Sequence, residues 1–138
     1  MSGSAPADTD APFWAALDAG HLELQRCAAC KTWHWPAVVH CRSCGSFDQE
    51  WLRVPLQGTV YTWTRTHHPF PGTEGLKTPF VTALVTIKET PVQLMGILEG
   101  EQEGEQEGLT IEARVTGRVL AGSESTSGKP AIRWRLDR

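Results

Sequence analysis

The sequence lacks the features of a membrane protein or a secreted protein. All of its apolar runs stop well short of the roughly 20 residues that a membrane-spanning helix requires. Residues 1–12 have neither the basic start nor the apolar core of a signal peptide. We therefore expect a cytoplasmic protein without a membrane partner, in a compartment where cysteines are normally reduced.

Clusters of basic residues are missing as well. The 13 Lys and Arg residues are outnumbered by 16 Asp and Glu, which gives a net charge of −3, and they are spread along the chain. Proteins that bind nucleic acids usually carry a basic patch whose phosphate contacts release counterions. The charge pattern therefore argues against nucleic acid as a partner.

Groups that could catalyse a reaction are few. The four cysteines all lie within residues 27–44, no serine lies in an activating motif, and no glycine-rich loop of the phosphate-binding kind is present. The best remaining candidates lie in "TRTHHPFPG", with Arg65 and Thr66 beside His67 and His68. A histidine can act as a general base. We expect these residues to form an interface, or a wall of a partner's substrate tunnel, rather than an independent active site.

The N-terminal part predicts one short helix. Residues 1–9 are small and polar and indicate a flexible leader, and residues 10–21 follow as the helical segment. Asp10 is a candidate N-cap, Pro12 suits the first turn, and Gly20 suits the position just past the end. Three apolar residues share one stripe: Phe13, Trp14 and Leu17. We expect this stripe to pack on the chain's own body, with a partner as the alternative.

The cysteines form the most specific motif in the sequence. Cys27, Cys30, Cys41 and Cys44 make two Cys-x-x-Cys pairs with ten residues between them. Two such turns facing each other place four sulfurs around a tetrahedral zinc ion. We expect a structural zinc ribbon over residues 22–52.

The alternatives for the cysteines are a redox pair and a catalytic zinc. A thioredoxin-type pair needs a βαβ setting that the pattern lacks. A catalytic zinc would leave one position open, and His34 or His40 could then replace a cysteine. Three basic residues directly adjoin ligands, and we hypothesise that they offset the thiolate charge: Arg26, Lys31 and Arg42.

The rest of the chain is mainly β. Five segments have strand character: "GTVYTWTRT", "FVTALVTIK", "PVQLMGIL", "LTIEARVTGRVL" and "AIRWRL". Five short strands over residues 53–138 favour a five-stranded OB-fold barrel, with an SH3-like barrel or a small sandwich as alternatives. The segment Glu99–Gly108 alternates Glu with Gly and Gln and predicts a solvated loop.

Tryptophan is abundant, with six residues in 138. Such a number favours exposure of some of them at a contact surface. Trp33 and Trp35 have period-two spacing in the ribbon hairpin and are candidates for a seam with the barrel or with a partner. Trp63 and Phe70 lie on either side of the histidine pair, and we expect them to face substrate or partner.

The order of these parts resembles the family called domain of unknown function 35, in which a rubredoxin-like zinc ribbon precedes an OB-fold. The resemblance spans roughly residues 12–136. Its most specific elements are "LQRCAAC", "CRSCGS", "GTVYTWT" and "PFVTALV". The chain departs from the family pattern at Lys31, where glycine is usual, and in the insert Glu99–Gly108.

The resemblance implies an accessory role in acyl-CoA metabolism. Family members pair with a thiolase-like aldolase or a thiolase, or with a MaoC-type enoyl-CoA hydratase, in lipid, steroid and aromatic acyl-CoA metabolism. In steroid side-chain degradation the partner performs a retro-aldol cleavage, and the catalytic residues are the partner's. It implies a CoA thioester as substrate of the complex and, since thiolase-like proteins commonly dimerise, a two-plus-two assembly. Arg65 and Lys77 are candidates for CoA contacts.

The alternative function is that of a single-stranded nucleic-acid-binding module, because zinc ribbons and OB-folds both serve that purpose. The aromatic residues needed for stacking are present. The acidic ribbon half, with three basic against six acidic residues over 1–51, lacks the electrostatic attraction that such binding requires.

Overall fold

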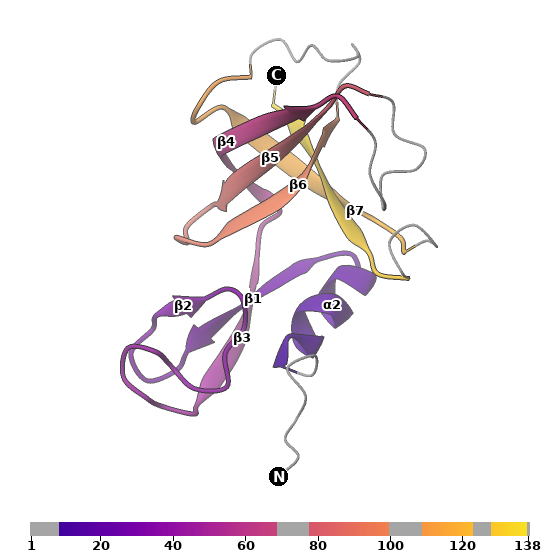
Figure 1. Cartoon of the computed structure of the whole chain (residues 1–138). Helices are drawn as coiled ribbons and strands as arrows, with labels where there is room; N and C mark the ends of the chain where they lie inside the picture. The colour runs from indigo at the N-terminus through magenta and orange to yellow at the C-terminus, as the bar shows by residue number, and fades with distance from the viewer. Residues whose placement is uncertain (1–8, 69–77, 100–108, 123–127, 138) are drawn as a thin grey trace.

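A computed structural model shows a helix, a small sheet and a barrel arranged along the chain (Figure 1). It describes residues 9–68, 78–99, 109–122 and 128–137. Phe70, Lys77 and most of the leader and of the Glu/Gly insert lie outside these residues. The helix α2 spans Ala11–Asp18. Among the described helices none is long and apolar enough to cross a membrane.

Helix α2 ends as its sequence predicts but begins differently. Gly20 has φ +92°, and the N–H groups of Gly20 and His21 donate to the carbonyls of Leu17 and Ala16, which forms a Schellman motif. The prediction that the Asp10 side chain caps the helix is wrong. Its Oδ2 instead accepts a hydrogen bond of 3.1 Å from Nε1 of Trp14, because the indole lies one turn along the same face.

The ribbon is built on a three-stranded antiparallel sheet in the order β2-β1-β3. Its strands are β1 (Leu22–Cys27), β2 (Trp33–His34) and β3 (Gln49–Val54). The expected division between ribbon and barrel at residue 52 falls inside β3. Only Pro55 and Leu56 separate β3 from the first barrel strand.

The remaining strands close into the predicted five-stranded OB-fold barrel. They are β4 (Gln57–Thr66), β5 (Phe80–Ile87), β6 (Gln93–Glu99), β7 (Arg114–Leu120) and β8 (Ala131–Leu136). The order β4-β5-β6-β8-β7 closes through β7 and β4, and β6 and β8 form the parallel pair. Closure pairs the edges that an open sheet would expose.

The strand expected from Leu109 begins later than the sequence pattern predicts. Residues 109–113 are not in a strand, and β7 starts at Arg114. The N–H of Ala113 donates to the carbonyl of Thr110, and Glu112 adopts φ +69°. This turn breaks the β conformation that the alternating pattern favours.

One continuous core joins all three parts of the chain. Phe13 and Leu17 of α2, Leu22 and Leu24 of β1 and the inward residues of the barrel belong to a single buried cluster. The helix also reaches the barrel at its surface, where Lys129 Nζ lies 4.4 Å from the centre of the Trp14 ring. The apolar stripe of α2 therefore packs on the chain's own body, as expected.

Trp134 fills the barrel interior in space left by two glycines. Its side chain is fully buried and points between β6 and β7. A Cβ on Gly117 would lie 2.8 Å from Cζ3 of the indole, and one on Gly96 would lie 2.9 Å from its Cδ1. A larger residue at Gly117 would require the ring to move, and one at Gly96 would also meet the carbonyl oxygen of Ile132 at 2.7 Å.

We therefore expect Gly117→Ala to destabilise the barrel by about 1–3 kcal/mol through overpacking against the ring. Urea unfolding monitored by tryptophan fluorescence measures the change. Trp134→Phe removes the crowded part of the indole, so a double-mutant cycle should show a compensating interaction between the two substitutions. Strictly additive losses would contradict the proposed clash.

Candidate metal centre and its surroundings

The four cysteine thiols meet at one end of the ribbon. Their sulfur atoms all lie within 4.8 Å of one another, with 3.6 Å between Cys27 and Cys44 and 3.5 Å between Cys30 and Cys41. A tetrahedron with Zn–S bonds of 2.3 Å has S···S edges of about 3.8 Å. The set therefore fits a zinc ion, and four sulfurs would close its coordination shell.

The two Cys-x-x-Cys turns have matching backbone geometry. In the first, the N–H of Lys31 donates to the carbonyl of Cys27 at 2.8 Å, and in the second the N–H of Gly45 donates to that of Cys41 at 2.9 Å. Lys31 and Gly45 both have positive φ, +69° and +81°. The departure from glycine at position 31 thus leaves the turn intact but puts a side chain in the left-handed region, which costs about 1–2 kcal/mol.

Backbone amides point at the sulfurs, as a thiolate site requires. The N–H of Cys30 donates to the sulfur of Cys27 at 3.4 Å, and those of Ser43 and Cys44 donate to the sulfur of Cys41. The bond from Cys30 lowers the pKa of Cys27. The Thr32 hydroxyl and then the Thr32 backbone lower the pKa of Cys30 to about 6.

The last thiol holds its proton most tightly. The Ser46 backbone lowers the pKa of Cys44, but hydrogen bonding to the Cys27 sulfur, burial and the other two sulfurs outweigh it and raise that pKa to about 12. Four neighbouring thiols cannot all ionise without a cation between them. This electrostatic conflict is what a divalent metal would relieve.

The predicted charge compensation takes a different form in the structure. Nε of Arg26 donates to Glu50 at 2.8 Å, and Lys31 lies 3.7 Å from the same carboxylate. Two of the three basic residues beside the ligands therefore share one acidic partner, which the sequence could not show because Glu50 lies on β3. The Arg26 guanidinium also lies 5.4 Å from the Trp33 ring centre.

The loop between the two turns is held by a buried glutamine that sequence reasoning missed. Gln25 is 3% exposed, its Nε2 donates to the carbonyl of Val38 at 2.9 Å, and its Oε1 accepts from the N–H of Val38 at 2.8 Å. Such a two-way amide contact substitutes for a strand partner. Only the unusual burial of a polar residue reveals it.

His34 is also buried, but it is not a metal ligand in this arrangement. Its Nε2 has no hydrogen-bond partner among the described residues. Burial, followed by the nearby Arg42 charge, lowers the pKa of this histidine. Neither His34 nor His40 belongs to the group of atoms that could hold the metal. The sulfurs make up the ligand set without them.

The other predicted contact residues separate into two groups. Trp33 and Trp35 are half-buried against the core, and the Trp35 ring lies 4.2 Å from that of Phe13 in the helix. Trp63, opposite Ala83 in the barrel, packs on the core. Arg65, His67 and His68 are exposed at the end of β4, away from the ribbon (Figure 1). The structure thus keeps Trp33 and Trp35 of the ribbon apart from Arg65, His67 and His68.

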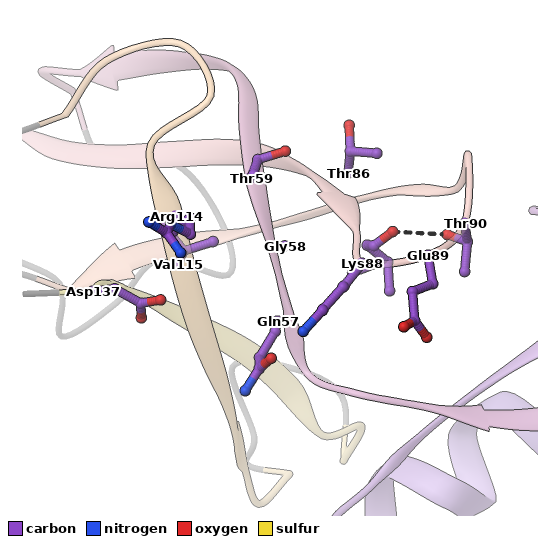
Figure 2. Close-up of a pocket in the computed structure, with 11 residues that line it drawn as sticks. Gln57, Gly58, Thr59, Thr86, Lys88, Glu89, Thr90, Arg114, Val115 and Asp137 are labelled. Atoms are coloured by element: carbon purple, nitrogen blue, oxygen red, sulfur yellow. Dashed lines mark hydrogen bonds between the residues drawn. The ribbon is translucent and has the colours of Figure 1, made fainter.

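A pocket of about 460 Å³ lies where β4 begins, between the β5–β6 turn and the C-terminal end of β8 (Figure 2). Lys88 and Arg114 contribute positive charge to its lining, and Glu89 and Asp137 contribute negative charge. No cysteine, serine or histidine is among the described residues that line it. The described lining of the pocket therefore holds no Ser–His or Cys–His pair.

A four-cysteine ribbon joined to a closed five-stranded barrel defines the class of zinc-ribbon/OB-fold proteins. Within this class the chain belongs to the ChsH2 family. Residues 14–50 match the ChsH2 rubredoxin-like zinc ribbon domain, and residues 51–120 match the ChsH2 C-terminal OB-fold domain. The resemblance to the domain of unknown function 35 family is thereby confirmed.

Two solved structures share the fold. A chain of the "Ltp2-ChsH2(DUF35) aldolase" is 29% identical and superposes with a TM-score of 0.77 over 93% of this chain and 94% of that one. A DUF35 protein of unknown function from Sulfolobus solfataricus is 19% identical, with a TM-score of 0.57 over 91% of this chain and 83% of that one. The second likeness shows the fold alone.

A curated relative matches over part of its length. The "Probable enoyl-CoA hydratase alpha subunit" of Thermomonospora curvata is 42% identical over 81 residues, which is 58% of this chain. The matched region spans 25% of that relative, so most of the relative has no counterpart in the match.

The positive φ of Lys31 in the first Cys-x-x-Cys turn yields one prediction. Lys31→Gly should stabilise the zinc-loaded protein by about 1 kcal/mol, because glycine adopts positive φ without strain. Thermal unfolding measures the change. Lys31→Ala is the matched control, since it removes the charge near Glu50 and keeps the strain. Equal stabilisation by both variants would assign the effect to charge and contradict the backbone explanation.

The protonated Cys44 thiol yields a second prediction. Zinc must displace protons from the cluster, so its apparent affinity should fall as the pH falls, by at least about tenfold per pH unit for each proton released. Competition with a chromophoric chelator between about pH 8 and pH 6 measures this slope. Cys44→Ser should lower the affinity at every pH. An affinity that does not change with pH would contradict four-thiolate binding.

Proposed function

We propose that this chain is a non-catalytic accessory subunit, which binds a thiolase-like enzyme and supports carbon–carbon bond cleavage of an acyl-CoA. The observation that carries the proposal is the match to the ChsH2 chain type of the Ltp2-ChsH2 aldolase, which covers nearly the whole of both chains. A likeness that includes helix, ribbon and barrel supports a shared role more strongly than a barrel alone would.

Zinc has a structural role in this proposal. Cys27, Cys30, Cys41 and Cys44 would hold it in a closed shell of four sulfurs, so that no position remains for water or substrate. The ion neutralises thiolate charge and ties the two turns together. It therefore stabilises the ribbon without taking part in the reaction.

The catalytic residues belong to the partner. Within the described residues, the four thiols are committed to the ribbon, and His34 is buried with its imidazole beside Arg42. His67 and His68 are exposed at the end of β4. No described serine or free cysteine lies beside a histidine in the pocket or in this region, which supports an accessory role.

In the proposed complex, the helix and ribbon make one set of contacts and the end of β4 makes another. The helix and ribbon, with Trp33 and Trp35 at their seam, form the docking region for the thiolase-like subunit in a cytoplasmic two-plus-two assembly. The end of β4, with Arg65, faces the CoA thioester in the partner's tunnel. The proposed substrate, from the family resemblance, is an acyl-CoA of lipid or steroid side-chain degradation.

A second candidate partner is an enoyl-CoA hydratase. The observation that favours it is the 42% identity to part of a probable hydratase alpha subunit. A hydratase partner would use the same zinc ribbon and barrel as a fused or associated module. The reaction supported would then be hydration, and the accessory role of this chain would be the same.

Co-expression with thiolase-like and hydratase-like proteins encoded near its gene tests the proposal. We expect one of them to co-purify with this chain, and its retro-aldol, thiolytic or hydratase activity to fall on the order of tenfold or more when the chain is omitted. Cys41→Ser, which breaks the metal set, should reduce both recovery of the complex and its activity. Full activity of the partner alone would defeat the accessory-subunit hypothesis.

A further inference from the structure

The outer face of the barrel carries an ordered row of side chains across four strands. The registers pair Thr82 with Ile97, Ile97 with Arg133, and Arg133 with Arg118. Directly paired residues point to the same side of a sheet, so these four project outward together. The adjacent rows add Leu84 paired with Met95 on one side, and Glu99 paired with Arg135 on the other. We call this surface the β5–β6–β8–β7 face.

One half of this face is apolar. Met95 is 67% exposed although methionine is normally a core residue. Leu84 and Ile97 are half-exposed, and neither belongs to the buried cluster or to the residues packed against it. An exposed methionine beside partly exposed Leu and Ile side chains is typical of a protein interface.

The other half is basic. Arg118 reaches across β8 to Glu99, with Nε to Oε1 at 3.0 Å and Nη2 to Oε2 at 2.5 Å. Arg133 and Arg135 lie on the strand beneath this bridge and form no ion pair with a described residue. Among the described residues, this half of the face therefore holds three guanidinium groups and one carboxylate, which gives it a net positive charge.

The charges around Glu99 and Arg133 support a site that lacks a second carboxylate. The Arg118 hydrogen bond, with further attraction from Arg118, Arg135 and Arg133, holds the pKa of Glu99 below its usual value. Burial lowers the pKa of Arg133 most, attraction to Glu99 opposes this effect, and repulsion from Arg118 adds to it to a smaller extent. A further carboxylate placed over Arg133 and Arg135 would stabilise their charged forms.

We propose that the β5–β6–β8–β7 face is a second docking surface for the partner enzyme, which meets it with an apolar patch bordered by carboxylates. The inference rests on the proposed function, since it assigns a further contact to the same complex. Charge complementarity identifies the occupant: this face is positive, although the chain as a whole has a net charge of −3.

Single-stranded nucleic acid fits the face less well. Binding of that kind combines a positive groove with aromatic side chains on which successive bases stack. The apolar side chains that reach the surface of this face are Met95, which is exposed, and Leu84 and Ile97, which are partly exposed; none of them provides a ring for stacking. Arginine beside methionine and isoleucine is instead the composition of a protein contact.

The test measures the affinity of the purified full-length chain for its co-purifying thiolase-like protein by biolayer interferometry. We expect Met95→Asp and Arg133→Glu each to weaken binding by about tenfold or more, the first by placing a charge in an apolar contact. Raised salt should weaken wild-type binding, and should weaken Arg133→Glu binding less. Ile111→Asp is the matched control, because Ile111 is 56% exposed and lies outside the face.

The outcomes separate this inference from the proposed function. If the wild-type complex forms and both face variants bind as the wild type does, the barrel contact is refuted and the accessory role stands. If the wild type binds no candidate partner, the proposed function fails, and this inference fails with it. If the wild type binds a single-stranded oligonucleotide and the two face variants lose that binding, a nucleic-acid surface replaces the partner contact. Equal thermal stability of the three variants and the wild type excludes misfolding as the cause.

Discussion

The ribbon depends on its sulfur cluster, because its own strands bury too little to hold it together. Within residues 22–54 the buried apolar side chains are Leu22 and Leu24, with Cys27 and Cys41 among the ligands. A segment this small has no core without a metal or a neighbouring apolar surface. The four thiols supply the ligands for a metal, and the helix and the barrel supply the apolar surface through the shared core.

This shared core links the helix, the ribbon and the barrel. Phe13 contacts the ring of Trp35, while Leu17 and Leu22 belong to the same buried cluster as Val60 and Val115 of the barrel. Interfaces of separate domains are usually small and polar, and they permit relative motion. A shared apolar cluster instead favours a restricted arrangement of the ribbon and the barrel.

Local patterns predicted the elements, and long-range register determined what the patterns could not show. The cysteine spacing and the period-two strands depend only on neighbours in sequence, which is why the ribbon and the barrel were predictable. Two contacts depend instead on which side chains meet in space. Asp10 accepts a hydrogen bond from Trp14 and does not cap the helix, and Glu50 pairs with Arg26. The late start of β7 depends on a turn in which Glu112 takes a positive φ, a conformation that no turn residue in the sequence marks.

The difference between neighbours in sequence and neighbours in space also changes what the lack of a basic cluster in the sequence means. Arg118, Arg133 and Arg135 are too far apart in the sequence to count as a cluster, yet the pairing of β7 with β8 places them on one face. The sequence therefore excludes a linear basic motif, and it does not exclude a basic surface. That surface adjoins Met95 and Ile97, and the closed sulfur shell leaves the ribbon no open metal position for chemistry. Both features agree with the proposed accessory role, in which the chain acts through the faces that it presents to a partner.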